Sequence, residues 1–149
     1  MSVDRVAFPN ARNVLRTSDA TDRYNCFAWA AGADDCFWDP RLHWPDGATR
    51  GRDFDALKSA YATLGFAPCT HGELEAGIDK IAIYATLASA TSPARPTHAA
   101  RQLPSGRWTS KLGADIDVEH DLADLEGPGY GRALYFLARP RHTAVTPPT

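Results

Sequence analysis

A cysteine at the start of a short apolar segment is the residue of this chain best suited to covalent chemistry. Cys26 lies in the stretch RYNCFAWAAG at residues 23–32, where we expect a short helix to begin. The unpaired N–H groups and the positive dipole end of a helix start favour thiolate, the nucleophilic form of cysteine. Far downstream, His98 heads the strand-like segment THAARQL at residues 97–103. The two residues predict a cysteine-dependent hydrolase, with Cys26 as nucleophile and His98 as base.

A third residue has to orient the imidazole of His98. If PSG at residues 104–106 is the turn of a hairpin, Ser110 lies on the same face as His98, whereas a one-residue change of register would replace it by a neighbour. A carboxylate stabilises an imidazolium better than a hydroxyl does, and Asp117 follows the hairpin closely enough to fold back. We therefore expect Asp117 in this role, ahead of Ser110 and of a backbone carbonyl.

Four residues are candidate substrate contacts: Tyr24, Asn25, Trp44 and Trp108. Asn25 and the backbone N–H of Cys26 are placed to form an oxyanion site. Tyr24 either contributes a hydroxyl to the same cleft or packs as an aromatic at its rim. Trp44 belongs to an aromatic, proline-rich loop at residues 33–52, which either walls the cleft or rigidly covers the core.

The remaining histidines and cysteines give no case for a cofactor or a metal. Three cysteines without a signal peptide argue against a disulfide framework, and no pair has the spacing of a zinc site. We expect Cys36 and Cys69 to be buried and inert. His120 is a competing base, or pairs with an acidic neighbour on an exposed turn.

Size and charge narrow the class of protein further. The 149 residues, 44% of them hydrophobic, predict one domain at residues 1–140 and a proline-rich disordered tail at 141–149. A net charge of −2 gives no electrostatic case for nucleic acid or a membrane surface. The expected partner, a peptide or amide-containing substrate, follows from the chemistry of Cys26 and His98. No apolar run reaches the length of a membrane span, and no signal peptide is visible, so we expect a cytoplasmic protein unless a specialised system exports it.

The elements that must position these residues follow from periodicity and turn chemistry. Helices are predicted at residues 24–31, buried, and 53–64, amphipathic, with a helical turn at 121–125. Strands are predicted at residues 80–85, 98–103, 107–112, 115–120 and 132–138, with a loop at 88–96 and a turn at 113–114. A helix followed by mostly antiparallel strands predicts an α+β fold, in which a buried N-terminal helix packs on a small antiparallel sheet.

These segments resemble the NlpC/P60 and CHAP branch of the papain-like cysteine hydrolases. There a cysteine opens a helix, a histidine opens a strand and a polar residue sits on the following strand. Cys26 and His98 match those positions, and WTSKLG at residues 108–113 is similar to the strand that follows. The resemblance implies a papain-like fold.

More of the chain resembles an uncharacterised bacterial family of unknown function. Its members share the phrases FPN at residues 8–10, YNCxAWA at 24–30, THAAR at 97–101, WTSKLG at 108–113 and DxxH at 117–120. This resemblance implies a bacterial, single-domain protein and assigns no activity.

The sequence therefore predicts a small cysteine hydrolase, an amidase or peptidase. Three alternatives stay open. Cys26 is structural in a non-catalytic binding module whose partner surface is the aromatic loop at residues 37–44. A cysteine acyltransferase or transglutaminase-like enzyme would share Cys26 and His98 but exclude water. A toxin domain would use the same site against a competing cell.

Overall fold

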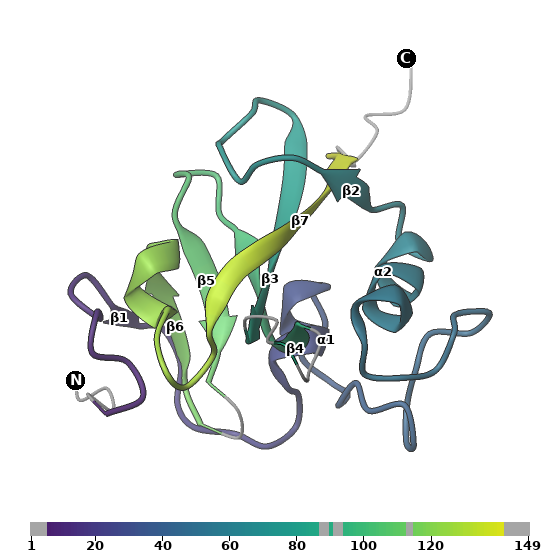
Figure 1. Ribbon diagram of the computed structural model, residues 1–149, viewed down its shortest axis with the longest axis horizontal. Helices are drawn as coiled ribbons and strands as arrows, with labels where there is room; N and C mark the ends of the chain where they lie inside the picture. Colours follow the sequence, from purple (N-terminus) through teal and green to yellow (C-terminus); the bar gives the residue numbers. More distant parts are fainter. Residues whose placement is uncertain (1–5, 87–89, 91–93, 113–114, 142–149) are drawn as a thin grey trace, which may run out of the picture.

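A computed structural model describes residues 6–86, 90, 94–112 and 115–141. Within these ranges the chain forms a seven-stranded antiparallel sheet in the order β1-β6-β5-β4-β3-β7-β2 (Figure 1). The strands are β1 (Leu15–Arg16), β2 (Ala67–Cys69), β3 (Ile78–Thr86), β4 (Arg95–Gln102), β5 (Trp108–Lys111), β6 (Asp117–His120) and β7 (Arg132–Pro140). The helices are α1 (Cys26–Ala30), α2 (Phe54–Ala62) and the 3-10 helix η1 (Leu122–Leu125).

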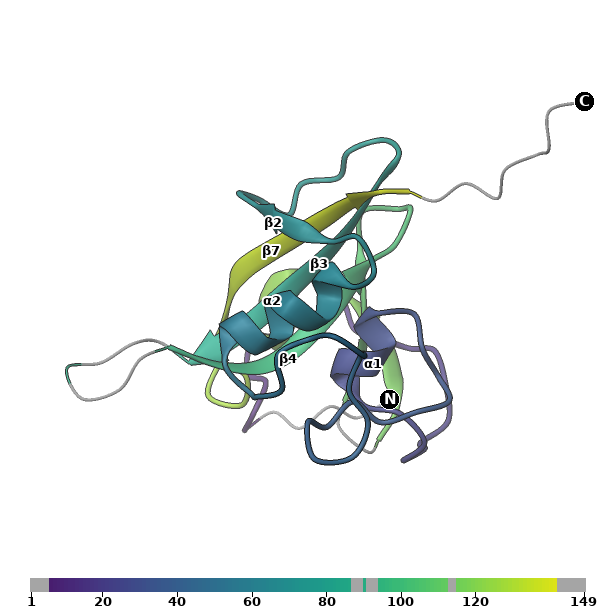
Figure 2. The ribbon, with the colours of Figure 1, turned by 90° about the vertical axis from the view of Figure 1, so that its right-hand side faces the viewer.

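Side chains alternate between the two faces of the sheet along each strand, and a separate core cluster covers each face. Ile81, Ile83 and Ala99 share one core cluster with residues of α1 and α2, and Figure 2 shows these two helices on the same side of the sheet. Ala82 and Tyr84 pack instead in a second cluster on the other face, where Phe8, Ala11 and Leu125 of η1 cover them. We refer to these as the helix face and the η1 face.

The two predicted helices are confirmed, and their caps explain where they begin. The side-chain oxygen of Asn25 accepts the N–H of Ala28 at the start of α1, and that of Asp53 accepts the N–H of Ala56 at the start of α2. Such capping satisfies N–H groups that have no partner within the helix. After α2 the chain turns at Gly65, whose φ of 91° suits glycine.

The predicted hairpin is also confirmed, with the predicted register. The N–H of Leu103 donates to the carbonyl of Arg107 over 2.7 Å, and Arg101 pairs with Thr109. The strands predicted at residues 80–85, 115–120 and 132–138 and the helical turn at 121–125 appear as β3, β6, β7 and η1. The turn predicted at 113–114, most of the loop at 88–96 and the tail after residue 141 lie outside the described residues.

The predicted α+β, papain-like fold class is wrong. The structure is mainly β: α1 has 5 residues and α2 has 9, whereas the sheet has seven strands. The sheet grows beyond the predicted size because β7 returns to pair with β3, and because β1 and β2 add short edges. The loop at residues 33–52 adds no helix that would balance the sheet. Among the described residues, no helix combines the length and apolar character needed to cross a bilayer.

Candidate active site

Three buried side chains from neighbouring strands form a hydrogen-bonded chain on the η1 face. Nε2 of His98 on β4 lies 2.8 Å from Oγ of Ser110 on β5, and the same oxygen lies 2.6 Å from Nε2 of His120 on β6. Nδ1 of His120 continues the chain to the carbonyl oxygen of Asp121 over 2.8 Å. His98, Ser110 and His120 are each 0% exposed, so this chain is buried in the structure.

Aromatic rings fix the plane of the His98 imidazole. Tyr130 stacks on it with ring centroids 4.1 Å apart and planes 7° apart, and Tyr84 meets it nearly edge-on at 5.4 Å. The hydroxyl of Thr97 donates to the carbonyl of Tyr130 over 2.5 Å, which ties the loop between η1 and β7 to β4. Burial lowers the pKa of His98 well below its usual value of 6.5, so the ring is neutral at neutral pH.

The other nitrogen of this ring, Nδ1 of His98, is buried and has no hydrogen-bond partner in the described part of the chain. Buried polar atoms are almost always paired, and the exceptions need a reason. Nδ1 is therefore the atom of this site whose bonding capacity the fold leaves unused.

Cys26 is the first residue of α1 and its thiol is buried, with 8% of the residue exposed. Burial raises the pKa of Cys26 to about 11, against the opposing effect of the backbone amides of Ala99, Phe27 and Cys26 itself. The sequence predicted a thiolate here, but the structure gives a protonated thiol at neutral pH.

The thiol of Cys26 and the imidazole of His98 approach the sheet from different sides: α1 packs on the helix face, whereas His98 pairs with Tyr84 and projects to the η1 face. Ala99, whose amide acts on the sulfur, directly follows His98 on β4. Burial, and then the charge that Cys26 would carry as a thiolate, raises the pKa of Tyr130, whose ring stacks on His98. Cys26 and His98 thus both lie beside Ala99 and Tyr130, and no hydrogen bond between them is found among the described residues. In this resting arrangement both groups are uncharged.

Asp117 lies on the helix face, away from the imidazole of His98. One of its carboxylate oxygens accepts the hydroxyl of Tyr24 over 2.6 Å, and the pKa of Tyr24 rises to about 12 because of burial and then this contact. Asp117 pairs with Lys111 of β5, and paired residues share one face of a sheet. Ser110 precedes Lys111 along β5 and therefore points to the opposite face from Asp117. Of the two predicted orienting residues, Ser110 contacts His98 and Asp117 does not.

The side chain of Asn25 is fully engaged in shaping the chain around α1. Its oxygen accepts the N–H groups of Ala28 and Trp38, and its amide nitrogen donates to the carbonyl of Trp38 over 2.8 Å. The oxygen and the amide nitrogen of this side chain, predicted to help form an oxyanion site, are thus both engaged by groups of the chain itself. Among the other predicted substrate contacts, Tyr24 stacks on Trp29 and Trp108 packs near Phe136 in the core.

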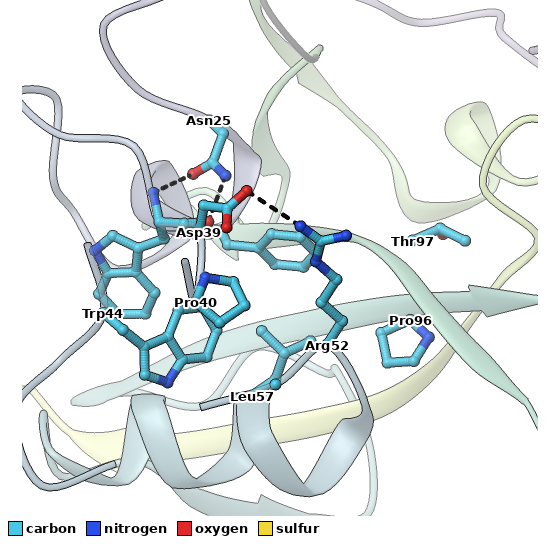
Figure 3. A pocket seen from close by; sticks show the side chains of 11 residues that line it. Asn25, Asp39, Pro40, Trp44, Arg52, Leu57, Pro96 and Thr97 are labelled. Carbon is cyan, nitrogen blue, oxygen red and sulfur yellow. Dashed lines mark hydrogen bonds and ion pairs between the residues drawn. The ribbon is translucent and has the colours of Figure 1, made fainter. Parts of the chain in front are cut away.

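A pocket of about 170 Å³ lies beside the residues that flank Cys26 and His98. Figure 3 shows the carboxylate of Asp39 directed at the guanidinium of Arg52, an ion pair of 3.3 Å. Apolar side chains surround this pair. The lining residues are Asn25, Phe27, Trp38, Asp39, Pro40, Trp44, Gly51, Arg52, Leu57, Pro96 and Thr97. Two predicted substrate contacts, Asn25 and Trp44, thus border one cavity.

Sequence reasoning missed two residues of this site. His120 was predicted as a competing base or as a residue of an exposed turn, but it is buried in β6 and pairs with Trp108 of β5, which places its ring on the face of Ser110. A strand alignment of residues 108–111 with 117–120 would have predicted this. Tyr130 carries no local signal, because a loop between η1 and β7 brings it to His98.

Metal ligands do not gather in the described part of the chain, where no group of three or more His, Cys, Asp or Glu side chains is placed to hold an ion. Cys36 and Cys69 are free cysteines that are only half-buried, so the prediction that both are buried is wrong.

Comparison with known proteins identifies the family. Residues 15–138 match the family model described as Domain of unknown function (DUF7689). The chain belongs to this family, which confirms the predicted membership of an uncharacterised family. No curated protein and no solved structure matches the chain. The matches lend no support to the resemblance to NlpC/P60 and CHAP enzymes.

Proposed function

We propose that this protein is a cysteine-dependent hydrolase of amide or peptide bonds, with Cys26 as nucleophile and His98 as base. The observation that carries this proposal is the state of the His98 ring. Nε2 is held by Ser110, the ring plane is held by Tyr130, and Nδ1 is buried without a partner. A structural histidine would have both nitrogens satisfied, whereas a general base needs one nitrogen available for a proton.

The neutral resting state defines the first chemical step. As the sulfur of Cys26 attacks the substrate carbonyl carbon, Nδ1 of His98 takes the thiol proton, and an S–C bond forms. The protonated imidazole then gives this proton to the leaving nitrogen as the C–N bond breaks. Water next attacks the thioester, with His98 accepting its proton, and the S–C bond breaks to release the acid and restore the thiol. The amides of Cys26, Phe27 and Ala99, which already act on the sulfur, are the available donors for developing negative charge.

The pocket beside Asn25 and Thr97 supports an apolar substrate group. Trp44, Pro40 and Leu57 supply apolar surface, and the ion pair of Asp39 with Arg52 supplies polar groups for orientation. Pockets that combine apolar walls with a few placed polar groups are typical of small-molecule and side-chain recognition. A peptide or acyl amide with a small apolar residue next to the scissile bond fits this lining.

One observation favours a second candidate, a non-catalytic binding module. Cys26 is 8% exposed, and burial raises its pKa to about 11, which suits a structural thiol beside a ligand pocket. In that case the pocket binds its ligand and no covalent step occurs. An acyltransferase, by contrast, would use the same Cys26 and His98 and deliver the acyl group to an amine.

Turnover of chromogenic substrates tests these candidates. We would assay peptidyl p-nitroanilides and acyl thioesters with apolar and charged residues next to the scissile bond, with and without an added amine. The hydrolase predicts turnover by wild type and by the matched control Cys36→Ala, and none by Cys26→Ala. Acyl transfer predicts the amide of the added amine as product. A binding module predicts no turnover by any form, and equal ligand binding by wild type and Cys26→Ala.

A further inference from the structure

The hydrogen-bonded chain behind His98 has a direction, which can be read from its fixed end. The carbonyl oxygen of Asp121 can only accept a hydrogen bond, so Nδ1 of His120, 2.8 Å away, must carry a hydrogen. A neutral imidazole has one N–H, so Nε2 of His120 is then a bare acceptor. It lies 2.6 Å from Oγ of Ser110, which must donate its hydrogen to it.

The hydrogen bond between Ser110 and His98 is fixed in the same way. Ser110 has a single hydrogen, and this hydrogen is used toward His120. Its oxygen therefore accepts from His98, whose Nε2 lies 2.8 Å away and must carry the hydrogen of that ring. Nδ1 of His98 therefore carries no hydrogen, and its lone pair has no hydrogen-bond partner among the described residues.

We propose that His120 is a positioning residue that acts through Ser110 to hold His98 in the tautomer protonated at Nε2, leaving Nδ1 ready to accept a proton. Three strands supply the three side chains, one each from β4, β5 and β6, so the fold itself sets the order of the links. Its role in turnover rests on the proposed hydrolase function, but the tautomer does not.

The opposite direction of the chain would require a charged His120. Only a doubly protonated ring could donate to both Asp121 and Ser110, and Ser110 would then donate to His98. Burial, together with the charge of Arg107, opposes a positive charge on His120. Its pKa is therefore held at about 4, although the carboxylates of Asp124 and Asp121 favour the charged ring. At neutral pH the direction deduced from Asp121 is thus the one that satisfies every donor.

The tautomer is measurable without any substrate. In protein labelled with ¹⁵N-histidine, two-bond ¹H–¹⁵N correlations distinguish a protonated from a bare ring nitrogen, and His98→Asn assigns the signals. We expect wild-type His98 with Nε2 protonated and Nδ1 bare, and His120 with the reverse. A wild-type His98 protonated at Nδ1 overturns the proposal, whatever the variants do.

Two variants separate positioning from simple packing. His120→Gln can still offer an acceptor oxygen to Ser110 and should retain the wild-type His98 tautomer, whereas His120→Leu removes the acceptor and should give a mixture. In turnover, His120→Leu should lower kcat on the order of a hundredfold, with little change in KM and partial rescue in His120→Gln. A pure wild-type tautomer in folded His120→Leu contradicts the proposal. If wild type shows no turnover, the hydrolase function fails, and the spectra still decide the tautomer.

Discussion

The imidazole of His98 lies flat against the phenol ring of Tyr130, with centroids 4.1 Å apart and an angle of 7° between the planes. The two residues come from distant parts of the chain, and the hydroxyl of Thr97 joins them by donating to the carbonyl of Tyr130. The loop before β7 thus sets the ring plane of the proposed base. Ser110 sets its in-plane direction through Nε2.

Removing the ring of Tyr130 should free the imidazole. We expect Tyr130→Ala to lower the free energy of unfolding by about 2 kcal/mol and to lower kcat at least tenfold, because a base out of position transfers protons poorly. Tyr130→Phe keeps the stacked ring and should retain most of the activity. Urea unfolding and turnover of the substrates above measure both effects. Equal kcat in Tyr130→Ala and wild type would show that the stacking does not position His98.

Gly131 holds the same loop against β3. Its φ is 78°, and a Cβ added there would overlap the carbonyl group of Ala85. We expect Gly131→Ala to cost about 3 kcal/mol, from left-handed strain together with overpacking. Gly47→Ala is the matched control, since Gly47 has a φ of 81° but open space around its Cβ position. That control should cost only about 1 kcal/mol. Similar losses in the two variants, measured by urea unfolding, would refute the steric argument.

Much of the local structure was predictable because its causes lie close in sequence. Asn25 and Asp53 cap α1 and α2 with their own side chains, and the turn at residues 104–106 fixes the register that brings Ser110 to His98. Alternation along β4 and β5 then places both side chains on one face. These features need only the neighbouring residues.

The rest depended on partners that are distant in sequence. β1 has two residues, and β2 has three, one of which is Pro68. Strands this short show no periodicity in the sequence. The charge of Asp117 made it the preferred partner of His98, but its pairing with Lys111 turns it to the helix face, where Tyr24 binds it. The predicted thiolate at Cys26 failed because burial by the surrounding core outweighs the few N–H groups at the start of α1.

Ser110 joins two buried imidazoles, so its hydroxyl should matter for stability as well as for activity. Ser110→Ala leaves Nε2 of both His98 and His120 without a partner. Stranding buried polar atoms should lower the free energy of unfolding by about 3 kcal/mol. Thr109→Val on the same strand breaks a single bond, to Trp29, and should cost about 1 kcal/mol. Urea unfolding compares the two, and equal losses would contradict the bridging role of Ser110.

Stability should fall as the solution is acidified. The folded state holds the pKa of His120 at about 4 against 6.5 in the unfolded chain, and it lowers that of His98 in the same direction. Between these values the unfolded chain binds more protons, so the free energy of unfolding decreases as pH falls. From pH 7.5 to pH 5, His120 alone should account for about 2 kcal/mol.

Urea unfolding across this pH range checks the prediction. His43→Asn, at an exposed position, serves as the control and should keep the wild-type slope. An unfolding free energy that is constant between pH 7.5 and pH 5 would mean that the two buried histidines titrate normally in the fold.

The most direct test of the account is which cysteine becomes acylated. We would treat folded wild type and His98→Asn with an activated acyl ester at pH 7.5, and locate the acyl group on Cys26, Cys36 and Cys69 by peptide mapping over time. We expect Cys26, although buried, to be acylated before the two half-buried cysteines in wild type, and we expect this preference to be lost in His98→Asn. Acylation of Cys26 that is slower than that of Cys36 and Cys69, or that does not depend on His98, would contradict it.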